Sequence, residues 1–346
     1  MQRLTETGKF LEISRREPEL LNTTTSFTLK NDTQVDVIAP GIIQFSPPLG
    51  ADYSCKHIVL SSGVHGNETA PIEICDDLVQ RILTSELTLK HRVLFLFGNL
   101  AAMDIAERFV EENMNRLFSG AHSAPPGLVN DERKRAKLLE DSITAFFADA
   151  GQGETRIHYD LHTAIRKSKN EKFAVYPYLH ERTHSKSQLA FMAACGVKTI
   201  LLSESATTTF SYYSSHKHNA HAFTVELGQV RPFGENDMSR FEQAKQSLTR
   251  LITEEDFAPE YPEKNMLIYR VNQVINREHE NFQLHFDGDT PNFTDYSEGT
   301  VLASEPGKIY KAQQDGEAIV FPNAKVAIGQ RALLTVVPTV LEKFDV

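Results

Sequence analysis

The 346-residue chain contains no tryptophan and only three cysteines, Cys55, Cys75 and Cys195, which are widely spaced and form no Cys-x-x-Cys pair. An odd number of isolated cysteines argues against a disulfide framework and against a thiolate zinc site. The sequence also lacks an apolar run of the roughly 18 residues that a membrane span requires. No signal-type apolar stretch occurs between Met1 and Asn22. The expected location is therefore the cytoplasm, with no membrane partner.

Positive charge is in deficit, with 36 Lys and Arg against 46 Asp and Glu and a formal net charge of −10. Nucleic acid or an anionic membrane would favour a basic surface, so neither is an expected partner. A small anionic substrate would instead have to be attracted by a few local arginines. The sequence leaves the oligomeric state open, a homo-oligomer included.

Apolar runs of strand length alternate with amphipathic stretches of helical length, which predicts an α/β fold with a mixed sheet and helices on both faces. The expected strands are 57–61, 92–98, 157–161, 173–176, 199–203 and 222–226. The expected helices are 70–85, 101–113, 131–149, 185–195 and 238–253.

The composition becomes acidic and proline-bearing at 253–264, which predicts a domain boundary there. We expect a catalytic domain over 1–257, in which 1–47 add edge strands. Short apolar runs after residue 264 are broken by Gly, Pro and Asp, so 258–346 should form a smaller β-rich domain that covers the cleft.

The segment Ser61-Ser-Gly-Val-His65-Gly-Asn-Glu68 follows one expected strand and opens a helix. Its His-x-x-Glu spacing can place an imidazole and a carboxylate on one zinc ion, at the strand end where open α/β sheets hold their sites. About one such spacing is expected by chance in a chain of this composition. It is, however, the only one here, and it lies in the context that a catalytic loop needs.

A third metal ligand is expected from another strand end, and His158-Tyr-Asp160-Leu-His162-Thr offers two histidines. His162 is preferred because it lies nearer the carboxyl end of the strand, although both histidines could simply pack in the interior. Asp160 could orient one of the metal ligands through a hydrogen bond without binding the metal itself. Two histidines and a glutamate would leave the fourth position of a zinc ion for water, as in hydrolytic sites.

Such a site also needs a general base that takes a proton and returns it to the leaving amine. Glu226 ends a late apolar strand and fits that role, although a glutamate at a strand end is more often a surface charge. Arg108 and Arg116 bracket a polar turn and could bind carboxylates or a developing oxyanion. The alternative is a charged helix face on which Arg108 pairs with Glu107, Glu111 or Glu112.

Taken together, the G-x-H-G-N-E loop, the N-x-x-A…R-F…N-R-x-F stretch, D-L-H-T and V-E-L-G resemble the zinc carboxypeptidase superfamily, in its aspartoacylase and succinylglutamate desuccinylase branch. The motifs stand in the family's order from about residue 63 to 228. The resemblance implies a zinc-carboxypeptidase-like sheet and one zinc ion per subunit, bound by His65, Glu68 and His162. It also implies that Glu226 is the base and proton shuttle.

The resemblance further implies that Arg108 polarises the scissile carbonyl, and that Asn115 and Arg116 clamp the carboxylate beside the cleaved amide. The overall layout is most similar to enzymes that hydrolyse N-succinyl-L-glutamate to succinate and L-glutamate, the last step of arginine catabolism by succinyl transfer. Zinc-activated water would attack the amide carbonyl. An aspartoacylase-like deacylase of another N-acyl amino acid and a peptide carboxypeptidase are the alternatives.

This substrate carries three carboxylates, so further cations should line the cleft. Arg166, Lys167 and Arg231 are candidates among which the sequence does not choose. One departure from the aspartoacylases concerns a tyrosine of their carboxyl-terminal unit, where this chain has Phe321 and therefore no phenolic hydroxyl.

Overall fold

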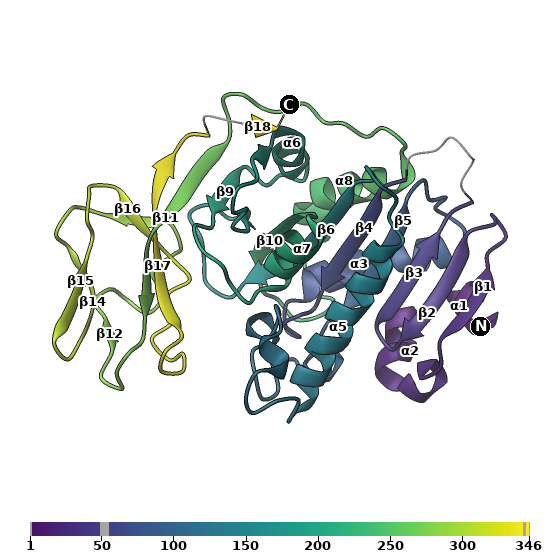
Figure 1. Cartoon of the computed structure of the whole chain (residues 1–346), viewed down its shortest axis with the longest axis horizontal. Helices are drawn as coiled ribbons and strands as arrows, with labels where there is room; N and C mark the ends of the chain where they lie inside the picture. Colours follow the sequence, from purple (N-terminus) through teal and green to yellow (C-terminus); the bar gives the residue numbers. More distant parts are fainter. Residues whose placement is uncertain (1, 49–54, 342–343, 346) are drawn as a thin grey trace.

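A computed structural model describes residues 2–48, 55–341 and 344–345 of the chain (Figure 1). A 13-stranded sheet runs through most of it, in the order β1-β2-β3-β5-β4-β6-β10-β7-β9-β11-β17-β16-β13. Its central strands are β4 (His57–Ser62), β5 (Arg92–Phe97), β6 (Arg156–Ala164), β10 (His221–Gln229), β7 (Phe173–Tyr176) and β9 (Thr199–Leu202).

The strands that carry the expected site residues are parallel neighbours. β4 lies between β5 and β6, and β6 also pairs with β10, all in parallel. Their carboxyl ends therefore meet at one edge of the sheet, where sites of open α/β sheets form. Every residue of β4 is buried, which is typical of a parallel strand covered on both faces.

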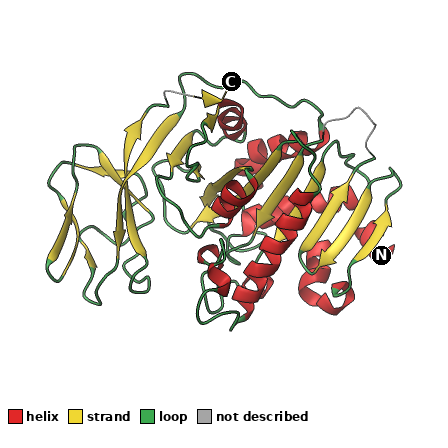
Figure 2. Cartoon of the chain, viewed as in Figure 1, coloured by secondary structure: helices red, strands yellow, loops and turns green. Residues whose placement is uncertain are grey.

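Helices cover both faces of this sheet (Figure 2). Ile58 and Leu60 of β4 face one hydrophobic cluster, whereas Val59 faces another, because successive side chains of a strand point to opposite faces. The first cluster includes side chains from α2 (Phe10–Arg16), α3 (Thr69–Leu83), α6 (Lys186–Ala194) and α8 (Glu242–Thr253). The second includes side chains from α5 (Asp131–Ala148) and α7 (Phe210–His218). The short helix α4 (Leu100–Asp104) follows β5.

The amino-terminal part of the chain forms the edge of the sheet through the antiparallel strands β1 (Thr25–Thr28), β2 (Gln34–Ala39) and β3 (Ile42–Ser46). Before them lie α1 (Gln2–Thr7), α2 and the 3-10 turn η1 (Pro18–Leu21), which the sequence did not predict. Leu11 and Ile13 of α2 are buried, so this segment packs on the core.

The carboxyl-terminal part is rich in strands, as expected. β11 (Leu267–Asn276) pairs in parallel with β9 and antiparallel with β17 (Arg331–Thr339), so the large sheet continues into this unit. β16 (Glu317–Val320) and β13 (Thr294–Tyr296) complete that edge. A separate sheet contains β12 (Gln283–Leu284), β14 (Val301–Glu305) and β15 (Lys308–Lys311), and β8 (His184–Ser185) pairs with β18 (Phe344–Asp345). The predicted fold class is confirmed, while the division near residue 257 stays a prediction.

The expected helix over 101–113 is wrong, because α4 ends at Asp104. The backbone then turns at Ala106, which has a φ of 56°. Beyond it, the N–H groups of Val110, Glu111 and Glu112 donate to the buried carboxylate of Glu132 and not to helical carbonyls. The chain resumes a helical turn only in η2 (Met114–Arg116). No helix in the described part of the chain meets the length and hydropathy that crossing a bilayer demands.

Candidate metal centre and its cleft

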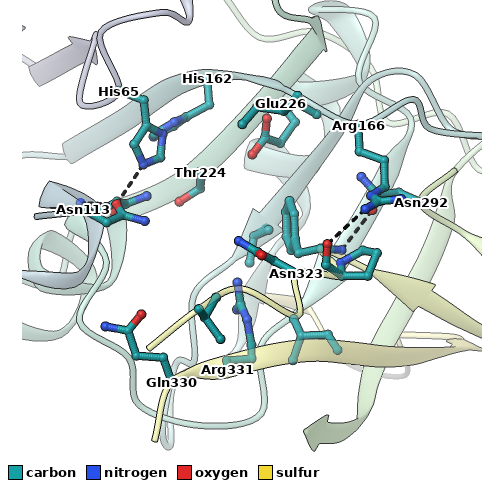
Figure 3. Close-up of a pocket in the computed structure, with 18 of the residues that line it drawn as sticks. His65, Asn113, His162, Arg166, Thr224, Glu226, Asn292, Asn323, Gln330 and Arg331 are labelled. Atoms are coloured by element: carbon teal, nitrogen blue, oxygen red, sulfur yellow. Dashed lines mark hydrogen bonds between the residues drawn. The ribbon is translucent and has the colours of Figure 1, made fainter. Parts of the chain in front are cut away.

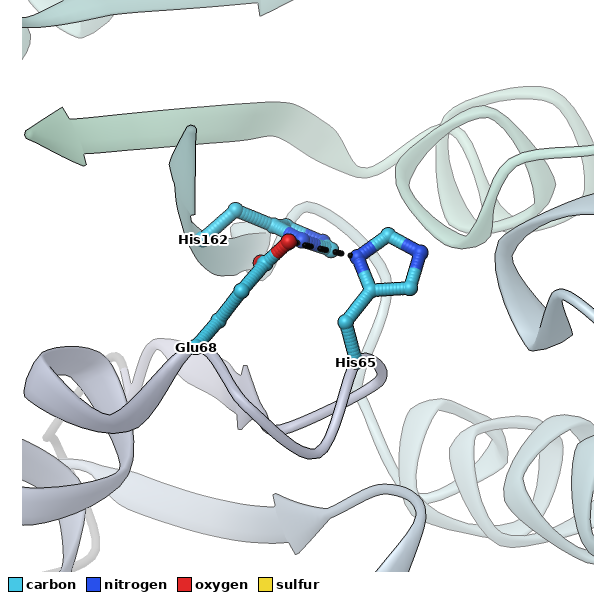
Figure 4. A group of neighbouring side chains, drawn as sticks. All are labelled: His65, Glu68 and His162. Carbon is cyan, nitrogen blue, oxygen red and sulfur yellow. Dashed lines mark hydrogen bonds and ion pairs between the residues drawn. The ribbon is translucent and has the colours of Figure 1, made fainter. Parts of the chain in front are cut away.

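His65, Glu68 and His162 come together at the carboxyl edge of the central strands (Figure 4). His65 and Glu68 lie in the loop between β4 and α3, and His162 lies on β6. All three are buried, and their ligand atoms lie within 4.8 Å of one another. Gly66 allows this loop to pass close to α4, since a Cβ there would lie 2.2 Å from the carbonyl carbon of Ala102.

Both imidazole rings turn the same nitrogen toward the carboxylate. His65 Nδ1 lies 2.9 Å from Glu68 Oε1, and His162 Nδ1 lies 2.7 Å from Glu68 Oε2. The opposite nitrogens are held from behind, His65 Nε2 by Asn113 Oδ1 at 2.9 Å and His162 Nε2 by Asp160 Oδ2 at 2.8 Å. An oxygen acceptor behind each ring fixes its orientation, as it does for metal-binding histidines.

His158, the other candidate of the second motif, stands apart from this group. Its Nε2 lies 2.8 Å from Ser61 Oγ and its Nδ1 lies 2.7 Å from Ser214 Oγ, so both ring nitrogens are occupied. Ser61 Oγ also donates to Asp160 Oδ1 at 2.6 Å. His158 and Ser61 thus support Asp160, which in turn orients His162.

The electrostatics of the group keep the Glu68 carboxylate ionised and the His65 imidazole neutral, which are the protonation states that bind a metal ion. Burial opposes ionisation of Glu68, but His65, His162 and Arg108 hold its pKa well below the usual range of a carboxyl. Burial lowers the pKa of His65 to about 4, with Arg108 adding to the effect. Two oriented imidazole nitrogens and an ionised carboxylate are a donor set that suits zinc and leave one tetrahedral position open.

Glu226 lies beside the group on β10, where it pairs in register with His162 of β6. Its Oε2 atom is shielded from solvent and has no hydrogen-bond partner among the described residues. Burial, reinforced by the charge of Glu68, raises the pKa of Glu226 to about 7. A carboxyl group with such a pKa can both take up and release a proton near neutral pH.

Arg108 also reaches this group, since its Nη1 donates to Glu68 Oε1 at 2.6 Å. It therefore does not form the alternative pairs considered from the sequence, and Glu112 pairs instead with Arg133 at 2.6 Å. Asn115 Oδ1 accepts the N–H of Phe210 at the start of α7, at 3.0 Å, which fixes its side chain and leaves its amide NH₂ group as a donor.

A cleft of about 1180 Å³ opens over these residues (Figure 3). Both the central sheet and the carboxyl-terminal unit line it. Cationic side chains outnumber acidic ones on its walls: the former are Arg108, Arg116, Arg166, Lys167, Lys325 and Arg331, and the latter are Glu68, Glu226 and Asp289. Arg231 is not part of the lining.

Three residues of the site were not predicted from the sequence. Asn113 holds His65, and Glu132 holds the loop that follows α4. Arg331 enters the cleft from the carboxyl-terminal unit. No local motif marks these positions, because each acts on residues that are distant in the sequence. Arg166, which was one of the candidates, donates to the carbonyls of Gly288, Thr290 and Pro322.

Comparisons with known proteins bear on the whole chain. Residues 54–252 match the succinylglutamate desuccinylase/aspartoacylase catalytic domain, and residues 264–339 match the AstE/AspA barrel-sandwich hybrid domain. The succinylglutamate desuccinylase of Pseudoalteromonas atlantica is 56% identical over 341 residues, which are 98% of this chain and 97% of that protein. The protein of the same name from Shewanella sp. strain MR-7 is 48% identical over 98% of both chains.

Solved structures of two succinylglutamate desuccinylases also match this chain over most of its length. The structure of succinylglutamate desuccinylase from Chromobacterium violaceum has a TM-score of 0.84 and 37% identity, over 97% of this chain and 99% of that one. The structure from Vibrio parahaemolyticus has a TM-score of 0.85 and 34% identity, over 95% and 94%.

Proposed function

Because this chain belongs to the succinylglutamate desuccinylase/aspartoacylase family, we propose that it is a zinc-dependent hydrolase that cleaves N-succinyl-L-glutamate into succinate and L-glutamate. The names of relatives that match nearly its whole length support this substrate. The reaction would be the last step of arginine catabolism by succinyl transfer, in the cytoplasm. One zinc ion per subunit belongs to the same proposal.

The observation that carries the proposal is the position of Glu226 beside His65, Glu68 and His162 in a cleft with cationic walls. A zinc ion held by those three side chains would act as a Lewis acid and lower the pKa of a water molecule to about 7. Glu226 has an unpartnered carboxyl oxygen with which to accept the proton of that water. It would then return the proton to the nitrogen of the leaving glutamate.

The cationic and amide groups would position the substrate. Arg108 lies next to Glu68 and would stabilise negative charge that develops on the carbonyl oxygen. Asn115 and Arg116 would bind the carboxylate beside the scissile amide, through the side-chain NH₂ group of Asn115 and the guanidinium of Arg116. These donors would hold the amide in place for attack.

A substrate panel tests the proposal. Zinc-loaded protein is expected to hydrolyse N-succinylglutamate with a higher kcat/KM than N-acetylaspartate or an amino-blocked dipeptide. A higher kcat/KM on N-acetylaspartate would indicate an aspartoacylase-like enzyme, and activity confined to the dipeptide would indicate a carboxypeptidase. Either outcome would overturn the proposed substrate.

The metal assignment has its own test. His65→Ala should lose zinc on dialysis. A matched change at His57, a buried histidine that pairs with Glu154 at the other end of β4, should retain most of it. Elemental analysis of the dialysed proteins measures both. An unchanged zinc content in His65→Ala would contradict the assignment.

A further inference from the structure

Arg331 is the first residue of β17 and follows a tight turn that aims it into the cleft. In this turn Gln330 N donates to Ala327 O at 3.0 Å, and Gly329 N donates to Arg277 O at 2.7 Å. Figure 3 shows Arg331 near Asn323 and Gln330, on the opposite side of the cavity from His65 and Glu226. The side chain thus belongs to the substrate cleft but lies away from the metal group.

The guanidinium of Arg331 is desolvated without a counter-ion. Its Nε atom is shielded from solvent and has no hydrogen-bond partner, and no acidic side chain in the described part of the chain forms an ion pair with it. The ring centroid of Phe321 lies 5.4 Å from the guanidinium carbon of Arg331. Phe321 offers the guanidinium an aromatic stacking surface and no hydroxyl group.

Arg116 is in the same condition. The one hydrogen bond described for its guanidinium is from Nη1 to the carbonyl of Asn115, at 2.8 Å. Burial lowers the pKa of Arg331 to about 9, and the charge of Arg116 adds to the effect, so the two guanidinium groups lie within electrostatic reach. Two desolvated like charges without an acid between them are costly, and a bound anion would relieve that cost.

The other guanidinium groups of the cleft differ in this respect. Arg108 pairs with Glu68, and Arg166 donates to three backbone carbonyls. Lys167 and Lys325 are exposed, so water solvates their charges. Arg116 and Arg331 are therefore the cleft arginines whose N–H donors are left for a ligand.

We propose that Arg331 binds the side-chain carboxylate of the leaving glutamate, next to Arg116, which binds the carboxylate beside the scissile amide. This inference rests on the proposed function. The two carboxylates of glutamate are joined by a short alkyl chain, as neighbouring guanidinium groups require. The terminal carboxylate of the succinyl group lies beyond the carbonyl that must reach Glu226, on the other side of the amide. Arg331 is thus the residue that selects an acidic amino acid as the leaving group.

The test compares substrates that differ in one carboxylate. N-succinylglutamine lacks the side-chain carboxylate, and N-acetylglutamate lacks the terminal acyl carboxylate. Arg331→Met is expected to lower kcat/KM for N-succinylglutamate and for N-acetylglutamate by about 10- to 100-fold each, since each loses a charge-assisted hydrogen-bonded pair. Most of the loss should appear in KM. The kcat/KM for N-succinylglutamine should change less than about threefold, because that substrate has no charge for Arg331 to bind.

Arg331→Lys and Arg270→Met are the controls. The lysine keeps the charge and should recover part of the preference for glutamate over glutamine. Arg270 is exposed on β11 outside the cleft, so its variant should match the parent protein on all three substrates. An equal loss on N-succinylglutamine would show that Arg331 only supports the fold. Loss confined to N-succinylglutamate, with N-acetylglutamate spared, would place Arg331 on the succinyl carboxylate. Either result overturns the inference.

Product binding separates this inference from the proposed function. If the parent protein fails to hydrolyse N-succinylglutamate, the proposed function fails. Calorimetry with L-glutamate and L-glutamine then still tests Arg331. The parent protein should bind glutamate more tightly than glutamine, and Arg331→Met should bind the two alike; an undiminished preference in the variant would refute the inference.

Discussion

The loop that carries Arg108 and Asn115 depends on one buried carboxylate, and Glu132→Gln should release it. Glu132 Oε1 accepts from Asn99 Nδ2 at 3.0 Å and from Val110 N at 2.6 Å. Oε2 accepts from Glu111 N and from Glu112 N, each at 3.0 Å. A glutamine has one carbonyl oxygen, so its NH₂ group must face two N–H donors.

The magnitude follows from those contacts. Hydrogen bonds to a charged group contribute roughly 1.5–3 kcal/mol each, and two of them are lost. Relaxation of the loop reduces the sum, so we expect the free energy of unfolding to fall by about 2–4 kcal/mol. A shift of about 1 Å in a substrate-positioning group can cost on the order of 10²-fold in rate, so kcat/KM should fall by a similar factor.

Urea unfolding and steady-state kinetics on N-succinylglutamate measure the two effects. Glu111→Gln is the matched control, because the Glu111 side chain is exposed on the same loop and only its backbone N–H contacts Glu132. It should resemble the parent protein within about 0.5 kcal/mol. Unaltered stability and kcat/KM in Glu132→Gln would show that this carboxylate does not hold the loop.

Two further predictions concern buried carboxyl groups. Burial, with the neighbouring Asp77 charge, raises the pKa of Asp76 to about 6, above its unfolded value of about 3.9, so the protonated form is favoured in the folded state. Ionised Asp76 destabilises the folded state, and this cost is absent below about pH 4 and grows as the pH rises toward 6. The free energy of unfolding of Asp76→Asn should therefore exceed that of the parent protein by about 1–3 kcal/mol at pH 7 and by little at pH 4. Denaturant unfolding at both pH values checks this, and a gain independent of pH would contradict it. Asp160→Asn should weaken zinc binding by about 10- to 100-fold, because an amide cannot orient His162 as a carboxylate does; competition with a chelator measures the affinity, and parental affinity would refute the role.

The sequence predicted those features of the fold that rest on local patterns. Runs such as 92–98 and 222–226 became strands because their apolar content and length determine burial in a parallel sheet. The loop with His65 and Glu68 was predictable since both residues lie in one turn. His162 could be preferred over His158 from the direction of the strand, and the structure places it in the group that His158 does not join.

Features that depend on distant partners could not be predicted. The stretch 101–113 has the apolar spacing of a helix, but Glu132 competes for its N–H groups. Arg331 enters the cleft only because β17 pairs with β11 at the far end of the large sheet. The sequence around 101–113 does not indicate the contact with Glu132, and the sequence around Arg331 does not indicate the pairing of β17 with β11.

In the proposed reaction, Glu226 moves the proton at a zinc site made by His65, Glu68 and His162. The most direct test of this role is the kcat of Glu226→Gln on N-succinylglutamate, measured together with the zinc content of the same sample. The variant should bind one zinc ion per chain, as the parent protein does, and its kcat should be lowered by about 10²- to 10⁴-fold. Near-parental turnover by the zinc-loaded variant would contradict it.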